Sequence, residues 1–339
     1  MSADAPFVSV IIATRDRAEL FGLALKSVLA QTWADKEVIV VNDGSAAAQL
    51  PVYEKHWAEA AELLGERFRV FHLVRRSIGH GPSYALNVGV DQAAGRYVTF
   101  LDDDDLWVDE AHLQRAAACI AAHASPAQTV DLYTSNQDAF AADGRHIGRL
   151  WLGKLEAALL SKGRKPSALG CIEVSVDEFL LADGFAHLNC LMVRRELFQQ
   201  VGGLDEAVRW EGDRSLFLKL IDSAALKLHH PAVIGRHHVP NPQLKANVTT
   251  SISMIDKRLQ QIIVLDRFLL HAKHASLRRY AVQHKGYALK RLAQELGQAG
   301  DWERASSYAW EALGLAPGLK WLGFCLYGSA RRRYRPAAR

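Results

Sequence analysis

The first 135 residues alternate between strand-like and helix-like segments, and this alternation constrains the fold more than any other feature of the chain. β-Branched apolar runs are followed by stretches with apolar residues at helical spacing. The segments are, in order, strand 7–13, helix 17–31, strand 36–45, helix 52–66, strand 68–74, helix 82–95, a strand from residue 96, helix 109–123 and strand 131–136. Such alternation predicts an open, mostly parallel sheet with helices on both faces. The expected fold class is therefore α/β.

The rest of the chain divides into an irregular and a helical part. Within 137–240, the stretch 148–170 has no clean period, and we expect a mobile loop there. From residue 251 onward the pattern is helical throughout. The segments 276–300 and 301–317 look like one tetratricopeptide-type helix pair, but stacked repeats need about three copies. We therefore expect a helical cap on the α/β part.

From the sequence we expect no targeting signal, and it contains no closely spaced cysteine pair. It has no run of about 18 uncharged apolar residues and so predicts no transmembrane helix. The start, MSADAPFVSVIIATRD, does not have the pattern of a signal peptide, and we expect a cytoplasmic location. The four cysteines lie far apart, at positions 119, 171, 190 and 325. This spacing argues against a zinc ribbon or disulfide framework and predicts reduced, buried thiols.

The net charge of +4 comes from the C-terminal tail. The final nine residues, RRRYRPAAR, hold five of the 41 basic residues, which leaves 36 basic against 37 acidic residues elsewhere. A nucleic-acid-binding protein needs a basic face on its folded body, and nothing outside the tail indicates one. We therefore expect no nucleic-acid partner.

An apolar run, residues 97–101, ends in four consecutive aspartates, Asp102 to Asp105. Adjacent carboxylates raise each other's pKa and destabilise a fold. The group is most easily tolerated where a cation such as a metal ion lies among the carboxylates, although aspartates are also common in turns and at helix N-caps. Four in a row after a buried strand favour a metal or substrate site.

Polar residues also follow two other predicted strands. Thr14, Asp43 and Asp102 each lie just beyond a strand end. In open α/β sheets, ligands bind at the carboxyl ends of the strands. Three separate sequence features therefore converge on one edge of the sheet, where we expect the functional site.

Four segments, in this order and spacing, resemble those of family 2 glycosyltransferases with the GT-A fold. They are VSVIIATRDRAELFGLALKSVLAQT, EVIVVNDGS, ALNVGVDQAAGRYVTFLDDDD and VGGLDEAVRWEGDRSLFLKL. The likeness covers about residues 7–240. It implies a Rossmann-like GT-A domain over 1–245, with a donor half at about 1–135 and an acceptor half at about 136–245. An all-helical region with a basic tail, 246–339, would follow. The resemblance also implies transfer of a sugar, with inversion, from a nucleotide diphosphate sugar to an acceptor hydroxyl.

The resemblance implies which residues of this chain bind the donor. They are Thr14, Arg15, Asp43, Asn87, Asp102, Asp103 and Arg236. Asp43 would accept a hydrogen bond from the N3–H of uracil or thymine, which implies a UDP- or dTDP-sugar; an Asx turn is the alternative. Asn87 matches the asparagine of the family's Ala-Arg-Asn segment, but Leu86 replaces its arginine. One diphosphate contact is therefore missing, or it comes from Arg75, Arg76 or Arg236.

The resemblance also implies a metal cofactor, Mn²⁺ or Mg²⁺, which prefers carboxylate oxygens and stabilises the charge of a leaving nucleotide diphosphate. Asp102 would face the ribose and Asp104 would bind the metal, with Asp103 as a rival ligand. In GRHHVP, the family's Arg-x-His pattern selects His238 as a further ligand. A zinc site formed by His237 and His238 with the pair at 229–230 is the less favoured alternative.

The acceptor hydroxyl needs a base, because a neutral alcohol is a poor nucleophile. The family places an acidic pair at the start of a helix, but here the pair is interrupted, in WEGDRS. Asp213 aligns with the base and Glu211 is the substitute. Acids that only complement the helix dipole are the simpler alternative. Trp210 could stack on an acceptor sugar or pack in the core.

The tail, 320–339, alternates aromatic and apolar residues before its arginines. Such a segment could make peripheral contact with an anionic membrane, at its inner face, or form a packed last helix with a disordered basic end. Membrane contact fits a glycan or lipid-linked acceptor in surface polysaccharide synthesis.

Two other functions remain open. A nucleotidyltransferase would carry a glycine-rich phosphate loop after the first strand, where IIATRDRAEL has no glycine. A catalytically degenerate scaffold protein would dock partners through its helical region.

Overall fold

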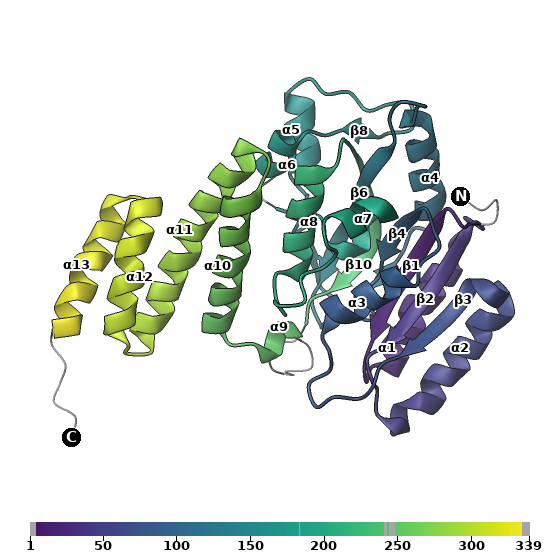
Figure 1. Ribbon diagram of the computed structural model, residues 1–339, viewed down its shortest axis with the longest axis horizontal. Helices are drawn as coiled ribbons and strands as arrows, with labels where there is room; N and C mark the ends of the chain where they lie inside the picture. The colour runs from purple at the N-terminus through teal and green to yellow at the C-terminus, as the bar shows by residue number, and fades with distance from the viewer. Residues whose placement is uncertain (1–4, 183, 241–242, 244–247, 334–339) are drawn as a thin grey trace. The chain divides into compact units, whose positions relative to one another are not determined.

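The computed structural model describes residues 5–182, 184–240, 243 and 248–333 (Figure 1). The chain divides into two compact units, Met1–Asn241 and Pro242–Arg339. The first is built on a sheet flanked by helices and the second is helical. The predicted α/β fold with a helical C-terminal extension is confirmed.

The first unit contains one sheet, ten-stranded over the described residues. Its main path runs β3-β2-β1-β4-β9-β6-β10-β5, with β7 paired to β6 and β8 paired to β10. The strands are β1 Val8–Thr14, β2 Lys36–Asn42, β3 Phe68–His72, β4 Tyr97–Phe100, β5 Leu106–Trp107, β6 Val130–Phe140, β7 His146–Gly148, β8 Ile172–Glu173, β9 Leu191–Arg194 and β10 Leu226–His238.

The longest paired stretches of this sheet are between parallel strands. β1 pairs with β2 over seven residues and β6 with β10 over nine, whereas the antiparallel partners β5, β8 and β9 pair over two or three residues. β1 and β2 run in the same direction and end together, at Thr14 and Asn42. β4 lies parallel on the other side of β1. Thr14, Asp43 and Asp102 therefore lie at one edge of the sheet.

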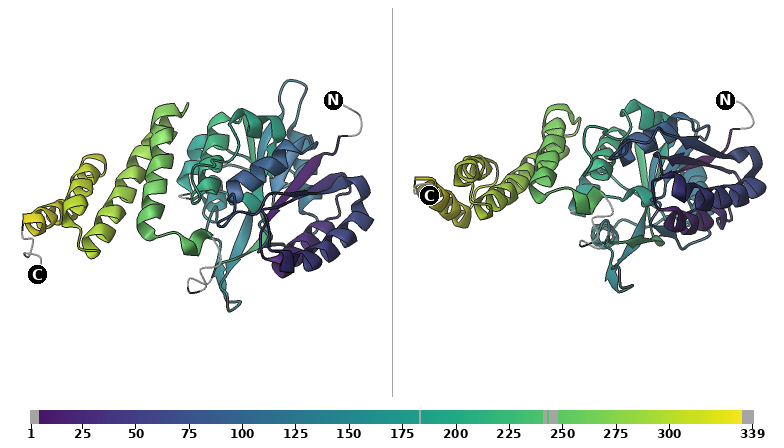
Figure 2. Two further views of the ribbon diagram at one scale, coloured as in Figure 1. Left: turned by 60° about the horizontal axis from the view of Figure 1, so that its bottom comes forward. Right: turned by 90° about the horizontal axis from the view of Figure 1, so that it is seen from below.

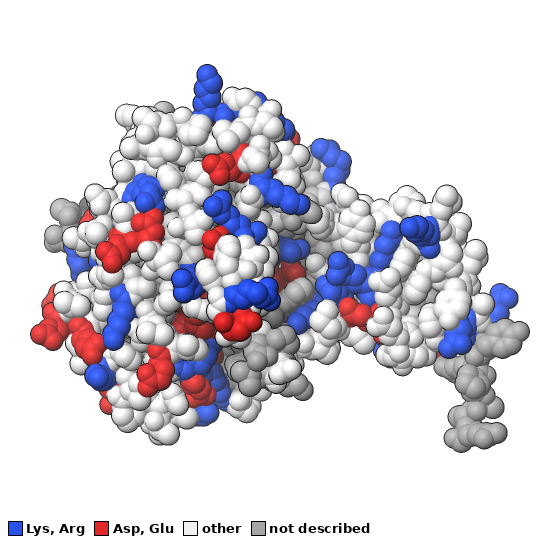
Figure 3. Space-filling view, turned by 180° about the vertical axis from the view of Figure 1, so that it is seen from behind, with Lys and Arg blue, Asp and Glu red and all other residues white. Residues whose placement is uncertain are grey.

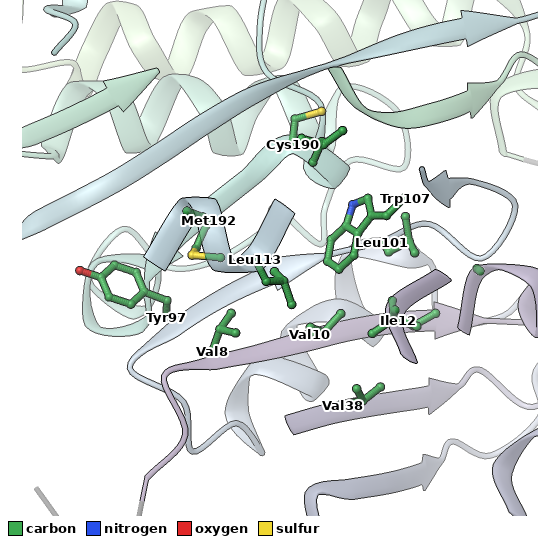
Figure 4. Close-up of a cluster of buried hydrophobic side chains, with 14 of the residues drawn as sticks. Val8, Val10, Ile12, Val38, Tyr97, Leu101, Trp107, Leu113, Cys190 and Met192 are labelled. Atoms are coloured by element: carbon green, nitrogen blue, oxygen red, sulfur yellow. The ribbon is translucent and has the colours of Figure 1, made fainter. Parts of the chain in front are cut away.

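Helices cover both faces of the sheet (Figure 2). They are α1 Ala18–Leu29, α2 Leu50–Leu64, α3 Pro82–Asp91, α4 His112–His123, α5 Leu155–Ser161, α6 Val176–Leu181, α7 Arg195–Gln200 and α8 Gly212–Ser223. Residues that alternate along β1 point to opposite faces. Val8, Val10 and Ile12 are buried with apolar side chains of α1, α2 and α4 (Figure 4). Ile11 faces α3, where a Cβ on Gly89 would lie only 2.5 Å from its Cγ2, so close packing there requires glycine.

Charged side chains of both signs are interspersed over the face of the first unit shown in Figure 3. The positive charge noted in the sequence lies instead at the end of the second unit. Its last helix carries Arg331, Arg332 and Arg333 in the final turn. The remaining tail arginines lie outside the described residues.

The second unit consists of α9 Val248–Ser251, α10 Met254–His271, α11 Ala275–Gln298, α12 Trp302–Leu315 and α13 Leu319–Arg333. α11 and α12 correspond to the predicted helix pair, and they turn at Gly300, whose φ of 84° favours glycine. A small core joins α11, α12 and α13 through Leu289, Ala309 and Trp321. None of the described helices is long and apolar enough to cross a membrane.

The lack of period in 148–170 suggested a loop, but part of this segment is helical. It contains α5, whose Leu155 and Leu159 are fully buried, and Leu152 before it is also buried. The helix is short and packs against α6. Two helical turns give too few apolar positions to produce a recognisable period, which explains the error.

The prediction of four reduced thiols is wrong for one pair. Cys119, in α4, forms a disulfide with Cys171, just before β8, and their Cα atoms lie 6.5 Å apart. Cys190 and Cys325 are free and buried. The sequence spacing of 52 residues gives no sign of the bond, because only tertiary packing brings the two cysteines together.

The disulfide should contribute to stability. A closed loop of this size reduces the entropy of the unfolded chain, and we expect reduction to lower the free energy of unfolding by about 2–4 kcal/mol. Urea denaturation with and without dithiothreitol measures this difference. The double variant Cys119→Ala/Cys171→Ala should lose the response to reductant, whereas Cys190→Ala should keep it. Four free thiols titrated in the unfolded, unreduced protein would contradict the bond.

Candidate active site

The four aspartates form the turn between β4 and β5, and their environments differ. Asp103 and Asp105 are buried, at 2% and 0% exposure. The side chains of Asp102 and Asp104 are 37% and 24% exposed. The backbone N–H of Asp105 donates to the carbonyl of Asp102, which closes the turn. Two carboxylates therefore point inward and two remain open to solvent.

Asp103 is held by residues at the end of β1. The Thr14 hydroxyl donates to its carboxylate at 2.6 Å, and the Arg17 guanidinium contacts the other oxygen at 2.9 Å. Thr14 also shares a hydrogen bond with the Tyr53 hydroxyl at 2.7 Å. Burial raises the pKa of Asp103 to about 7, even though the charge of Arg17 lowers it. Thr14, a predicted donor-binding residue, therefore touches the aspartate cluster directly.

Arg17 bridges two of the four aspartates, a role that was not foreseen from the sequence. Its Nη1 lies 2.5 Å from Asp104 Oδ2, while Nη2 contacts Asp103. Burial lowers the pKa of Arg17, but Asp103 and Asp104 raise it above its usual value. The available signal was its position three residues after Thr14, at the same sheet edge.

Asp105 is the most firmly held member of the cluster. Its carboxylate accepts hydrogen bonds from Asn189 Nδ2 at 2.6 Å and from the His238 backbone N–H at 2.8 Å, and it pairs with His237 Nδ1 at 2.8 Å. Burial acts to raise the pKa of Asp105, but the hydrogen bond and charge of His237 lower it overall. In return, Asp105 raises the pKa of His237 against the effect of burial.

Asn189, in the short 3-10 helix Leu188–Cys190, connects the cluster to the middle of the sheet. Its Oδ1 accepts the Asp102 backbone N–H at 2.9 Å, and its Nδ2 also donates to Gln137 at 3.1 Å. Although the Asp102 side chain is 37% exposed, its partial desolvation, together with the charges of Asp105 and Asp104, raises the pKa of Asp102 well above its usual value. The role of Asn189 cannot be predicted from the sequence, because a single asparagine that lies 84 residues from its partner Asp105 forms no recognisable motif.

Two groups of side chains have the geometry to hold a cation. The ligand atoms of Asp102, Asp104 and Asp105 lie within 4.8 Å of one another, and so do those of Asp105, His187 and His237. Carboxylate oxygens suit Mg²⁺ or Mn²⁺, and imidazole nitrogens suit softer divalent ions. This donor set fits a divalent cation.

The histidines occupy distinct positions around this cluster. His187 and His237 pack against each other and against Trp151, with ring centroids 4.9–5.1 Å apart. His238, the predicted ligand, donates from Nδ1 to the Asp104 carbonyl at 2.6 Å and is 41% exposed. His229 is buried and bonds to Thr134 at 3.0 Å. None of the cation-holding groups found among the described residues includes His229 or His230, which removes the basis for a four-histidine zinc site.

Asp43 and Arg15 hold the loop that precedes α3. The Asp43 carboxylate accepts the backbone N–H of His80 at 2.9 Å and of Gly81 at 3.3 Å, and it pairs with His80 Nδ1 at 2.6 Å. Arg15 donates to the carbonyls of Asp43 and Arg76. Asp43 thus lies at the predicted edge, with its oxygens on the loop at 80–81.

The other predicted donor-binding residues make contacts away from the aspartates. The Asn87 amide bonds to both the N–H and the carbonyl of Leu204, and also to Glu206. Arg236 lies over the Phe140 ring, 4.3 Å from its centroid. Arg75 bonds to Asp16 and to the Gly44 carbonyl.

The interrupted acidic pair begins α8. Glu211 is buried, has a left-handed φ of 72°, and pairs with Arg214 at 3.0 Å. Asp213, in the first turn, accepts the Arg214 N–H at 2.7 Å. Burial and His237 lower the pKa of His187, whereas the charge of Asp213 acts to raise it. Trp210 is half-buried just before this turn.

With this geometry established, comparison with known proteins identifies the family. Residues 9–171 match the model for glycosyl transferase family 2. These residues are a family 2 glycosyltransferase domain. The family predicted from the four sequence segments is therefore confirmed.

Curated relatives align over part of the glycosyltransferase domain. The chain is 36% identical over 100 residues to a GalNAc(5)-diNAcBac-PP-undecaprenol beta-1,3-glucosyltransferase of Campylobacter jejuni, which covers 30% of each chain. It is 30% identical over 106 residues to the putative glycosyltransferase EpsH of Bacillus subtilis, covering 31% of this chain and 28% of that protein. The matched segments thus span less than a third of these relatives.

Solved structures resemble the chain over nearly its whole length. S. aureus TarS 1-349 in complex with UDP-GlcNAc aligns with a TM-score of 0.66 at 18% identity, over 96% of this chain and 87% of that one. Mannosyltransferase PcManGT from Pyrobaculum calidifontis, in complex with GDP-Man and Mn²⁺, aligns with a TM-score of 0.56 at 19% identity, over 98% and 81%. At these identities the likeness shows the shared fold.

Removing the Asn189 side chain should destabilise the aspartate turn. Asn189→Ala removes one hydrogen bond from each of the Asp102 N–H, Asp105 and Gln137, and we expect a loss of about 2–4 kcal/mol in the free energy of unfolding. Asn136→Ala is the matched control, since the side chain of this buried asparagine makes one hydrogen bond among the described residues, to the Pro231 carbonyl. Urea denaturation measures both. An equal loss for the two variants would contradict the role assigned to Asn189.

Proposed function

We propose that the chain is a metal-dependent, inverting glycosyltransferase that moves a sugar from UDP or dTDP to an acceptor hydroxyl. The observation that carries the proposal is the aspartate and histidine cluster at the strand ends of a family 2 domain. A cation site beside a carboxylate base is the arrangement that this reaction needs.

The donor would lie along the edge formed by Thr14, Arg15 and Asp43. Asp43 is the residue suited to accept the N3–H of uracil or thymine. Its carboxylate bonds to the backbone at 80–81, so a bound base would share Asp43 with that loop or displace it. Asp102, which is partly exposed, would contact the ribose.

The metal would be held by Asp104, with His238 as a further ligand. When bound, a Mn²⁺ or Mg²⁺ ion neutralises the charge that develops on a departing nucleotide diphosphate. Asp104 is open to solvent at the cluster, and the His238 ring lies beside its carbonyl. Thr14 would fix the buried neighbour Asp103, and Asn189 the turn itself.

Asp213 would take the proton from the acceptor hydroxyl, which then attacks the anomeric carbon on the face opposite the nucleotide. This in-line displacement inverts the configuration. Its position in the first turn of α8 supports the role. Glu211 is buried and paired with Arg214, which favours Asp213 as the base and leaves Glu211 to shape the turn. Trp210 would stack on the acceptor sugar.

The acceptor would be a glycan, free or linked to a lipid. The name of the Campylobacter jejuni relative specifies a glycan on a polyprenyl diphosphate, and this chain is expected to act on an acceptor of similar class in surface polysaccharide synthesis, at the cytoplasmic side of the membrane.

α13 has the surface expected of a peripheral membrane contact. Leu319 and Leu326 are 89% and 58% exposed, and with Gly323 and Ala330 they fall on one face at helical spacing. The helix has no acidic residue and carries Lys320 and three terminal arginines. Exposed apolar side chains flanked by basic residues complement an anionic lipid surface.

Binding and turnover test the catalytic proposal together. UDP or dTDP, titrated calorimetrically, should bind with Mn²⁺ and much less in EDTA, and Asp104→Asn should remove the metal-dependent part. Asp213→Asn should keep nucleotide binding but lower sugar transfer by about 10²–10⁴-fold. Asp143→Asn, in an exposed turn, is the control. Full transfer by Asp213→Asn would exclude it as base, and failure of the folded protein to bind any nucleoside diphosphate would favour a scaffold role.

Vesicle sedimentation tests the membrane contact. The protein should bind phosphatidylglycerol vesicles and not phosphatidylcholine vesicles, and binding should fall with salt. Leu326→Glu should weaken binding by about tenfold or more, because it removes an apolar side chain and adds a repelled charge. Leu63→Glu, at an exposed leucine of α2, should bind like the wild type. Equal binding by both variants would contradict a contact through α13.

A further inference from the structure

Arg17 occupies the position of a cation within the aspartate cluster. One end of its guanidinium contacts Asp103 and the other contacts Asp104. We propose that Arg17 is an exchangeable counter-ion, which neutralises Asp104 in the empty site, releases it to the metal, and then contacts the diphosphate of the donor. This inference rests on the proposed function, since it assumes that the site takes a divalent cation and a nucleotide.

The two contacts of Arg17 are unequal. Asp103 is buried and has a second partner in Thr14. Among the described residues, Arg17 is the one partner of the Asp104 carboxylate, which is partly exposed. The guanidinium can therefore stay anchored on Asp103 while it leaves Asp104. An anchored arginine that changes partner loses little conformational freedom.

Metal binding and the Arg17 contact compete at Asp104. The carboxylate belongs to the cation-holding group with Asp102 and Asp105. Arg17 Nη1 lies 2.5 Å from Asp104 Oδ2, so the guanidinium already neutralises the carboxylate that would bind the ion. A divalent cation there would also repel the guanidinium. The ion binds best once Arg17 has left Asp104, so Arg17 lowers the affinity of the nucleotide-free site for metal.

The released guanidinium is well placed for the donor. Leu86 occupies the position of the arginine that the family uses to contact the diphosphate. Two of the alternative arginines already have partners elsewhere, since Arg236 lies over the Phe140 ring and Arg75 bonds to Asp16. Arg17 instead lies at the strand ends, beside the cation-holding carboxylates. A guanidinium binds phosphate oxygens in a bidentate manner, through two parallel N–H···O hydrogen bonds. The same side chain would then oppose metal binding alone and favour metal with nucleotide.

The two roles predict opposite effects of one substitution. In Arg17→Met, the affinity of the nucleotide-free protein for Mn²⁺, measured by electron paramagnetic resonance of the free ion, should rise by about tenfold, roughly the effect of one partly screened charge pair. In saturating Mn²⁺, the affinity for UDP, measured by calorimetry, should fall by about tenfold. Arg17→Lys should lie between the two proteins in both measurements, because it keeps the charge and loses the bidentate contact.

Arg115→Met is the matched control. Arg115 makes an ion pair of the same kind, with Nη1 at 2.5 Å from Asp109 and similar exposure, 27% and 21% against 31% and 24%. Its variant should leave both affinities unchanged, and thermal unfolding confirms that each variant is folded. If the wild type binds both Mn²⁺ and UDP, but Arg17→Met binds Mn²⁺ no more tightly than the wild type does, this inference is wrong and the proposed function stands. A wild type that binds neither ligand overturns the proposed function as well.

Discussion

The structure of the first unit depends on how it neutralises four consecutive carboxylates at the end of a buried strand. Like charges this close would destabilise the turn between β4 and β5 unless each were matched by a partner. Asp103 is matched by Thr14 and Arg17, and Asp105 by Asn189 and His237. These partners come from β1, from the segment before α1, from the 3-10 helix before β9, and from β10. The aspartates therefore join the two halves of the sheet.

The parts of the fold that the sequence predicts correctly are those with long apolar periods. β1 and β2 are rich in Val and Ile and are buried along their length, and α1 places buried residues at helical spacing, so local pattern and tertiary burial agree. The errors occur where the local pattern is short or the contact is remote. α5 spans seven residues, and the Cys119–Cys171 bond links segments 52 residues apart. No local rule reports such a contact.

The candidate site likewise has features that the sequence predicts and features that it does not. Strand direction alone brings Thr14, Asp43 and Asp102 to one edge, because parallel strands share their carboxyl ends. The sequence does not predict which partners these residues meet there. Arg17 and Asn189 are polar residues of common type, and they become important only because the fold places them against buried carboxylates. Their roles depend on desolvation, which is a property of the folded state.

The contacts of the four aspartates also indicate which of them face ligands, a question that the sequence leaves open. A carboxylate that is buried and already compensated by the protein gains least from an added cation, since its charge is already balanced. Asp103 and Asp105 are of this kind. Asp102 and Asp104 are the partly exposed pair, two residues apart, and Asp104 is balanced by one arginine that solvent can reach. Electrostatic balance therefore favours Asp102 and Asp104 as the carboxylates that face ligands, and Asp103 and Asp105 as those that hold the turn.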